Sequence, residues 1–227
     1  MTTQNIAHRG ASRDRPENTL PAFELAVEQG ADMIETDLHL LRDGAVVLYH
    51  DDEIGRRPVG LHSLGELRQS LPHAPTLEET LDALGQKIAW NLELKAPRSG
   101  PYPGLEAHAL AQVKRRGILE RTLFSSFSDA VLVKLRELEP KARLGTLVSA
   151  SHPHDILGRA ARVRSEALHL ELRLATEERV SEAHAAGYRV NVWTVDSAAD
   201  QRRLIGYGVD GIFTNLPAKL GAILRTQ

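Results

Sequence analysis

The sequence predicts an α/β protein that forms a single (β/α)8 barrel domain over residues 1–227. Short runs rich in Val, Ile and Leu alternate with longer segments of helical period, which is typical of parallel strands joined by crossover helices. The length of 227 residues and the 42% of hydrophobic side chains allow one sizeable core. Histidines and acidic residues follow several strand-like runs, and barrel enzymes place their chemistry at the carboxyl ends of the strands.

Nine segments have the pattern of a strand, one more than an eight-stranded barrel requires. They are 5–9, 32–37, 45–50, 88–94, 122–126, 142–148, 165–171, 188–194 and 209–214. The Asp43-Gly44 pair is a signal for a two-residue hairpin. We therefore expect the segment through Leu41 to rise above the barrel, turn, and return antiparallel from Val46 to His50. This hairpin brings His50 back toward the carboxyl ends of the barrel strands.

The first helix is predicted from Leu20, Phe23 and Val27, which share one face at helical spacing. One residue of the Asn18-Thr19 pair is the candidate N-cap, and Gly30 ends the helix. Further helices are expected near 76–84, 104–116, 128–138, 152–161, 176–186, 197–206 and 216–224.

The segment 51–75 contains Gly, Pro and polar residues and predicts a loop-rich excursion over the mouth of the barrel. Together with the hairpin it makes a short insertion over residues 39–75. We expect this insertion to cover the carboxyl ends of the strands, next to the predicted active site.

The composition excludes several classes of function. Lys and Arg total 28 against 30 Asp and Glu, so the chain offers no general attraction for nucleic acid. The polar start of the chain and the lack of an apolar run approaching the roughly 20 residues of a membrane span predict a cytoplasmic protein without stable membrane association. With no cysteine, disulfides, thiol catalysis and thiolate metal sites are excluded. The expected partner is a small-molecule substrate, and the oligomeric state stays open.

Three acidic residues near strand ends are the candidate metal ligands. Glu35 and Asp37 are two apart on a predicted strand, so both side chains leave the same face, roughly 7 Å apart along the backbone. Glu93 and Lys95 repeat this arrangement on a later strand. Three converging carboxylates make an all-oxygen site for one divalent cation, Mg²⁺ or Ca²⁺. The alternative is a salt-bridge cluster with Arg9 and Lys95, but this leaves an excess of negative charge.

Two of the ten histidines are singled out by their position. His8 and His50 each close an apolar strand-like run, which puts two imidazoles at the predicted active rim as candidate acid and base. Arg9 offers a planar fork for phosphate oxygens, and Gly10 leaves space for close approach. An arginine bound to Glu17 or Glu35 as structural support is compatible with this role.

Aromatic residues make up only 4% of the chain, so each has an individual interpretation. Phe127 and Trp193 follow two strand-like runs, and either is a candidate for the cavity wall against the carbon skeleton of a substrate. Packing in the core is the alternative for both. For His169 and Glu171, which share a face near another strand end, filling of the barrel is the preferred interpretation.

In this order, the motifs resemble the glycerophosphodiester phosphodiesterase family over essentially the whole chain. They are His8-Arg9-Gly10, Pro16-Glu17-Asn18-Thr19, Ile34-Glu35-Thr36-Asp37, Asp43-Gly44, Val46-Val47 to His50-Asp51, Glu93-Leu94-Lys95, Ser125-Ser126-Phe127, Val192-Trp193-Thr194-Val195 and Gly208-Val209-Asp210-Gly211. The resemblance implies a TIM-type barrel that hydrolyses glycerophosphodiesters to glycerol 3-phosphate and an alcohol. It also implies that His8 and His50 act as acid and base, that Glu35, Asp37 and Glu93 hold a divalent metal, and that Arg9 and Lys95 contact phosphate.

The chain departs from the family pattern at three places. The family often has Asp where this chain has Asn215, commonly has Asn where Asp196 stands, and has a longer segment where Arg56-Arg57-Pro58 lies. Two rival functions are a lysophospholipase D type activity on single-chain phospholipids and a catalytically silent barrel that binds phosphate esters. The first needs an apolar or membrane-facing surface, and no basic amphipathic helix suits that role. The second predicts the loss of a histidine or a metal acid, and all are present.

Overall fold

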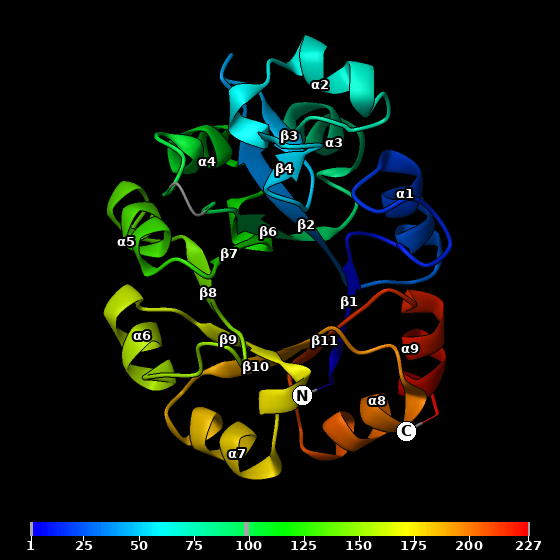
Figure 1. Ribbon diagram of the computed structural model, residues 1–227. Helices are drawn as coiled ribbons and strands as arrows, with labels where there is room; N and C mark the ends of the chain where they lie inside the picture. Colours follow the sequence, from blue (N-terminus) through cyan, green and yellow to red (C-terminus); the bar gives the residue numbers. More distant parts are fainter. Residues whose placement is uncertain (1, 98–99, 227) are drawn as a thin grey trace.

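The computed structural model describes residues 2–97 and 100–226 and forms a closed barrel of parallel strands with helices on its outside (Figure 1). Around the barrel the strands follow the order β1 (Gln4–His8), β11 (Gly211–Thr214), β10 (Arg189–Trp193), β9 (Ala167–Glu171), β8 (Arg143–Val148), β7 (Thr122–Ser126), β6 (Ala89–Leu94) and β2 (Met33–Leu40). Pairing of β1 with β2, from Ile6↔Met33 to His8↔Glu35, closes the cylinder. The predicted TIM-type (β/α)8 barrel is confirmed.

The predicted segment 45–50, the one in excess of an eight-stranded barrel, is the return arm of a hairpin, as expected. β3 (Val46–Leu48) pairs antiparallel with the upper end of β2, outside the closed barrel. The turn is longer than the predicted two residues, because Leu41 N donates to Ala45 O at 2.8 Å across a three-residue loop in which Gly44 has φ +85°. A left-handed residue at the end of such a loop is what a three-residue hairpin requires.

The insertion is more ordered than the sequence analysis predicted. After the short pair β4 (Glu53–Ile54) and β5 (Arg57–Pro58), helix α2 (Leu64–Ser70) occupies a stretch that was expected to be loop. The missed signal was a capping box, in which Glu66 N donates to Ser63 Oγ and Ser63 N donates to the Glu66 carboxylate. Leu67 anchors the helix in a small apolar cluster with residues of the hairpin.

Nine α-helices occur in the described residues. They are α1 (Leu20–Glu28), α2 (Leu64–Ser70), α3 (Leu77–Leu84), α4 (Leu105–Arg115), α5 (Asp129–Leu138), α6 (Ile156–Val163), α7 (Glu177–Ala185), α8 (Ala198–Gly206) and α9 (Pro217–Leu224). In α1 the fully buried residues are Ala22, Phe23 and Ala26, whereas Leu20 and Val27 are only half-buried. None of the helices in the part of the chain that the structure describes is long and apolar enough to cross a membrane.

Most of the apolar core lies between the outer face of the barrel and the helices. Two large clusters fill this layer, and in one of them Trp90 and Phe23 pack edge to face with ring centroids 5.7 Å apart. Another small cluster, of Ile6, Met33 and Phe213, lies on the alternate positions of β1, β2 and β11, inside the barrel. Apolar side chains therefore also fill part of the barrel interior.

Gly10 is required by the packing of β1 against α1. It has φ +85°, and a Cβ there would lie 2.7 Å from the backbone carbonyl carbon of Ala22. Gly10 was expected to leave space for the close approach of a ligand, but the space beside it is occupied by Ala22 of α1. We expect Gly10→Ala to lower the free energy of unfolding by about 1–3 kcal/mol from backbone strain alone, with a further loss from the clash, as measured by denaturant unfolding.

Gly30→Ala is the matched control for this prediction. Gly30 has a similar φ of +77°, but a Cβ added there would have no neighbouring atom within 4 Å. Its substitution therefore carries the backbone strain without the clash. An equal loss of stability in the two variants would contradict the role assigned to the contact between Gly10 and Ala22.

Candidate active site

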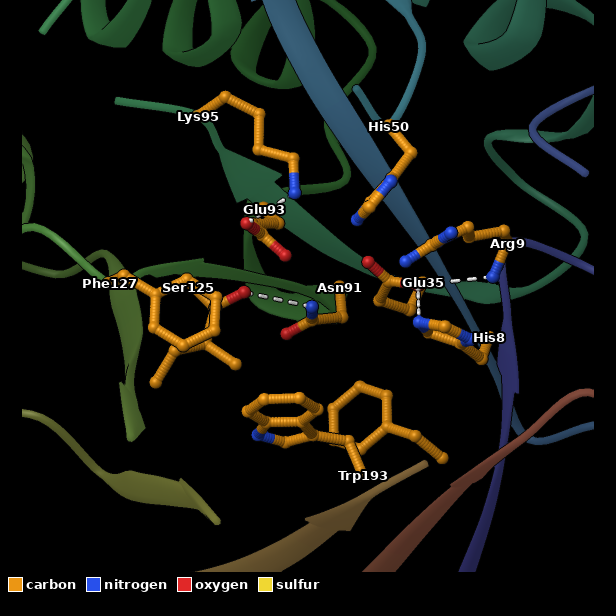
Figure 2. Close-up of a pocket in the computed structure, with 12 residues that line it drawn as sticks. His8, Arg9, Glu35, His50, Asn91, Glu93, Lys95, Ser125, Phe127 and Trp193 are labelled. Atoms are coloured by element: carbon orange, nitrogen blue, oxygen red, sulfur yellow. Dashed lines mark hydrogen bonds and ion pairs between the residues drawn. The ribbon is translucent and has the colours of Figure 1, made fainter. Parts of the chain in front are cut away.

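A cavity of about 120 Å³ opens at the carboxyl ends of the barrel strands. Its lining residues come from β1, β2, β6, β7, β8, β10 and β11, from segments that follow these strands, and from the segment after β3 of the hairpin. They are His8, Arg9, Glu35, His50, Asn91, Glu93, Lys95, Ser125, Phe127, Leu147, Trp193 and Phe213 (Figure 2). All the predicted site residues line this cavity except Asp37, which is 1% exposed and contacts the lining residues from behind.

Glu35, Asp37 and Glu93 converge as the spacing of their strands predicted. Register places Glu93 beside Asp37, and Glu35 and Asp37 occupy successive inward positions of β2. One carboxylate oxygen from each residue lies within 4.8 Å of the others, and all three side chains are buried. The arrangement is compact enough for a single cation to be shared by the three carboxylates.

Two cations pair with the same carboxylates. Lys95 Nζ lies 2.8 Å from Asp37 Oδ1 and 2.9 Å from Glu93 Oε1, and Arg9 Nε lies 3.2 Å from Asp37 Oδ2. The salt bridges of the alternative interpretation are therefore present. They leave three carboxylates against two cations. Among the described residues, the polar contacts of the Glu35 carboxylate are with the Arg9 amide at 3.0 Å and His8 Nε2 at 4.0 Å.

The pKa shifts of the three acids reflect this uneven pairing. Burial favours the neutral form of Asp37, but Lys95 and Arg9 outweigh it and hold the pKa of Asp37 well below its usual range. Burial, followed by the charges of Asp37 and Glu93, raises the pKa of Glu35 well above its usual range. Burial also raises the pKa of Glu93. Of the three acids, Glu35 is thus the one whose ionised form is least favourable in this environment.

His8 is oriented by a chain of hydrogen bonds from the last barrel strand. Its Nδ1 lies 2.8 Å from Asn215 Oδ1, while Asn215 Nδ2 donates to Asp196 at 2.8 Å. The contact with Asp196 fixes the orientation of the amide, so Asn215 Oδ1 accepts the proton of His8 Nδ1. His8 Nε2 then faces the cavity beside Glu35. Burial and the neighbouring Arg9 lower the pKa of His8 to about 4.

His50 reaches the cavity from the hairpin. The Tyr49 amide donates to Asp37 O at 3.1 Å, which holds the end of the return arm against β2. His50 Nδ1 lies 2.8 Å from Asp51 Oδ1, and the side chain is 38% exposed. In Figure 2 the His50 ring points toward the space between Glu35 and Lys95. His8 and His50 therefore approach the cavity from different elements.

Asn18 supports the site in a way that the sequence did not predict, whereas Glu17 makes the contact with Arg9 that was expected as structural support. Asn18, with φ +53°, does not cap α1; its Nδ2 donates to Asp37 Oδ2 at 2.9 Å, and its Oδ1 accepts from Thr36. Glu17 accepts from Arg9 Nη1 at 3.1 Å. In the sequence, Asn18 gave only a weak signal for this supporting role, because Asn is also a preferred residue for helix caps.

Phe127 and Trp193 form one wall of the cavity. Their rings pack edge to face with centroids 5.6 Å apart, and Trp193 Nε1 donates to the backbone oxygen of His169 at 2.9 Å. Phe127 is 43% exposed, so it is not a core residue. His169 is fully buried inside the barrel, where its Nε2 contacts Asn191 Nδ2 at 3.1 Å, in agreement with a packing role.

A model of the glycerophosphoryl diester phosphodiesterase family matches residues 8–219. The chain belongs to this family. It is 33% identical over 246 residues to the glycerophosphodiester phosphodiesterase of Caldanaerobacter subterraneus subsp. tengcongensis, with 99% of each chain covered. It is 29% identical to the glycerophosphodiester phosphodiesterase of Bacillus subtilis (strain 168), over 93% of this chain and 83% of the relative.

Solved structures of family members have the same barrel. An Oleispira antarctica phosphodiesterase in complex with the product sn-glycerol-3-phosphate aligns with a TM-score of 0.84 and 31% identity, covering 99% of this chain and 97% of the other. A glycerophosphodiester phosphodiesterase from Parabacteroides distasonis aligns with a TM-score of 0.84 and 27% identity, covering 99% and 98%. As a family member, the chain is a glycerophosphodiester phosphodiesterase, a phosphoric diester hydrolase.

Proposed function

We propose that the enzyme hydrolyses glycerophosphodiesters to sn-glycerol 3-phosphate and an alcohol with one divalent cation, Mg²⁺ or Ca²⁺, and with His8 and His50 as general acid and base. The observation that carries the proposal is that two imidazoles and the carboxylates of Glu35 and Glu93 line one cavity of about 120 Å³, with the Asp37 carboxylate clustered beside them. The Oleispira relative, whose solved complex holds sn-glycerol-3-phosphate, supports a small phosphate ester as the ligand class.

The carboxylate trio fits a divalent cation. The donors are all oxygen and lie within 4.8 Å of one another, and burial, followed by the charges of Asp37 and Glu93, raises the pKa of Glu35. A cation bound by Glu35, Asp37 and Glu93 would polarise the non-bridging oxygens of the phosphate.

Lys95 and Arg9 are the proposed contacts of the phosphate oxygens. An ammonium has three donors, and Lys95 uses two of them on Asp37 and Glu93. A guanidinium has five donors, so Arg9 also keeps donors beyond its contacts with Asp37 and Glu17. Both side chains can therefore bind phosphate without releasing the acids that hold them in place.

The tautomer of His8 suits it to the role of base. Since Asn215 accepts the proton of Nδ1, neutral His8 presents an unprotonated Nε2 to the cavity. We propose that this nitrogen takes the proton of the nucleophile, which is water or a neighbouring hydroxyl of the substrate. His50, held by Asp51 and facing the same cavity, then protonates the leaving alcohol oxygen.

An assay of the metal-depleted enzyme tests this proposal. We expect no release of sn-glycerol 3-phosphate from glycerophosphocholine after chelation, and recovery on separate addition of Mg²⁺, Ca²⁺ or Mn²⁺. Undiminished activity after chelation contradicts the metal assignment. Faster turnover of lysophosphatidylcholine than of glycerophosphocholine would favour the lysophospholipase D activity. Binding of glycerophosphocholine without turnover, with metal supplied, would identify a silent binding barrel.

A further inference from the structure

Asn91 is a buried amide at the floor of the cavity with an unpartnered polar atom. The residue is 1% exposed and lines the cavity together with Ser125. Asn91 Nδ2 donates to Ser125 Oγ at 2.9 Å, while Asn91 Oδ1 has no hydrogen-bond partner among the described residues. In Figure 2 Asn91 Oδ1 lies off the line of this hydrogen bond and points toward the side of the cavity where Trp193 lies. A buried carbonyl without a partner is costly unless a ligand or water satisfies it.

The need for a partner does not depend on the orientation of the amide. If the amide is rotated by 180°, its oxygen accepts from the Ser125 hydroxyl and its nitrogen takes the unsatisfied place. As the acceptor in the observed bond, Ser125 keeps its own hydroxyl proton for donation. In either orientation, the Asn91–Ser125 pair therefore has one hydrogen-bond donor and one acceptor left for a ligand in the cavity.

Asn91 lies deeper in the barrel than Glu93, at the level where the register places it beside Glu35. Asn91 is two residues before Glu93 on β6, so both side chains face the barrel interior, roughly 7 Å apart along the strand. A three-carbon arm attached to a phosphate at the level of Glu93 spans this depth. The lining of the cavity also includes the apolar side chains of Trp193, Leu147 and Phe213, which suit the carbon atoms of such an arm.

The size of the cavity restricts what can enter it. At about 120 Å³ it is well below the roughly 300–1,000 Å³ of pockets for drug-sized ligands. Only one small arm of a phosphodiester fits beneath the phosphate, and the other arm has to extend toward the open mouth. The cavity thus selects the smaller arm, while the polar floor selects its functional groups.

We propose that Asn91 and Ser125 bind the hydroxyl groups of the glycerol arm and so determine the specificity for polyhydroxy phosphate esters. This inference rests on the proposed function. Asn91 accepts a hydrogen bond from one substrate hydroxyl, and Ser125 donates to another oxygen of the same arm. An arm of equal length without hydroxyls leaves the floor unsatisfied. Sites built to bind a hydroxyl discriminate strongly against the analogue that lacks it.

The test is the binding of two product-like ligands to the full chain with Mg²⁺, measured by calorimetry. The ligands sn-glycerol 3-phosphate and n-propyl phosphate share a phosphate and a three-carbon chain and differ by two hydroxyls. We expect the wild type to prefer sn-glycerol 3-phosphate by about tenfold or more, and Asn91→Leu to reduce this preference by roughly two- to tenfold. The affinity for n-propyl phosphate should be unchanged or higher.

Asn191→Leu is the matched control. Asn191 is another buried amide of a barrel strand with an unpartnered Oδ1 among the described residues, but it contacts His169 and does not line the cavity. The inference is overturned if Asn91→Leu leaves the preference unchanged, if it weakens both ligands equally, or if Asn191→Leu changes the preference as much. A wild type that binds neither ligand refutes the proposed function; one that binds both equally refutes only the role of the floor.

Discussion

Replacing His8 or His50 by alanine is expected to lower kcat roughly 100-fold or more in each case. Each imidazole faces the same cavity, and each has a partner that fixes its orientation, Asn215 for His8 and Asp51 for His50. Loss of one leaves a proton transfer without its acid or base, while the acids and cations of the site stay in place. KM for glycerophosphocholine should change much less than kcat, because neither imidazole is needed to hold the phosphate.

His184→Ala is the control for a general effect of removing a histidine. His184 lies on α7, and its Nε2 contacts Asp210, which precedes β11 at the opposite end of the barrel. Steady-state kinetics of the three variants, with far-UV circular dichroism to check folding, decide the matter. Near-normal kcat in both His8→Ala and His50→Ala would contradict the acid and base assignment, and a loss confined to one variant would leave a single proton-transfer residue.

The barrel could be predicted because its signals are local and repeated. Each strand is a short apolar run and each crossover is a longer run of helical period. An error in the bounds of one element therefore does not change the predicted number of barrel strands. The errors occurred where a segment is stabilised by a few specific contacts. Helix α2 depends on the capping box of Ser63 and Glu66, and α6 begins at Ile156, after Pro153 and an Asp155 with φ +47°.

The site was predictable to the extent that position on a strand determines direction. Residues two apart on a strand face the same side, and the ends of parallel strands lie side by side. The sequence could therefore predict that Glu35, Asp37 and Glu93 converge, as they do in the structure. The supporting amides were not predictable in this way. Asn18, Asn91 and Asn215 have the same residue type and different contacts. Each contacts a partner that is distant in the sequence, which is Asp37 for Asn18, Ser125 for Asn91 and His8 for Asn215.

Replacing Glu35 by glutamine is expected to have opposite effects on the stability and the metal response of the enzyme. Without metal, Glu35→Gln should be at least as stable as the wild type, because it removes the acid whose ionised form is the costly one at neutral pH. The sign follows from the raised pKa: ionised Glu35 opposes folding once the pH exceeds its unfolded pKa. With metal, the order should reverse, because the variant lacks one of the three carboxylate ligands.

The size of this reversal separates a metal site from a salt-bridge cluster. A cation at 100 times its Kd stabilises the wild type by about 2.7 kcal/mol, which corresponds to a rise in Tm of about 5–10 °C for a chain of this size. Glu35→Gln should show little of this rise and should need at least about 100-fold more metal for half-maximal activity. Glu17→Gln, which removes an acid outside the trio, should keep the wild-type response. A pure salt-bridge cluster predicts no rise in any of the three proteins, because Arg9 and Lys95 would already supply all the positive charge that the acids require.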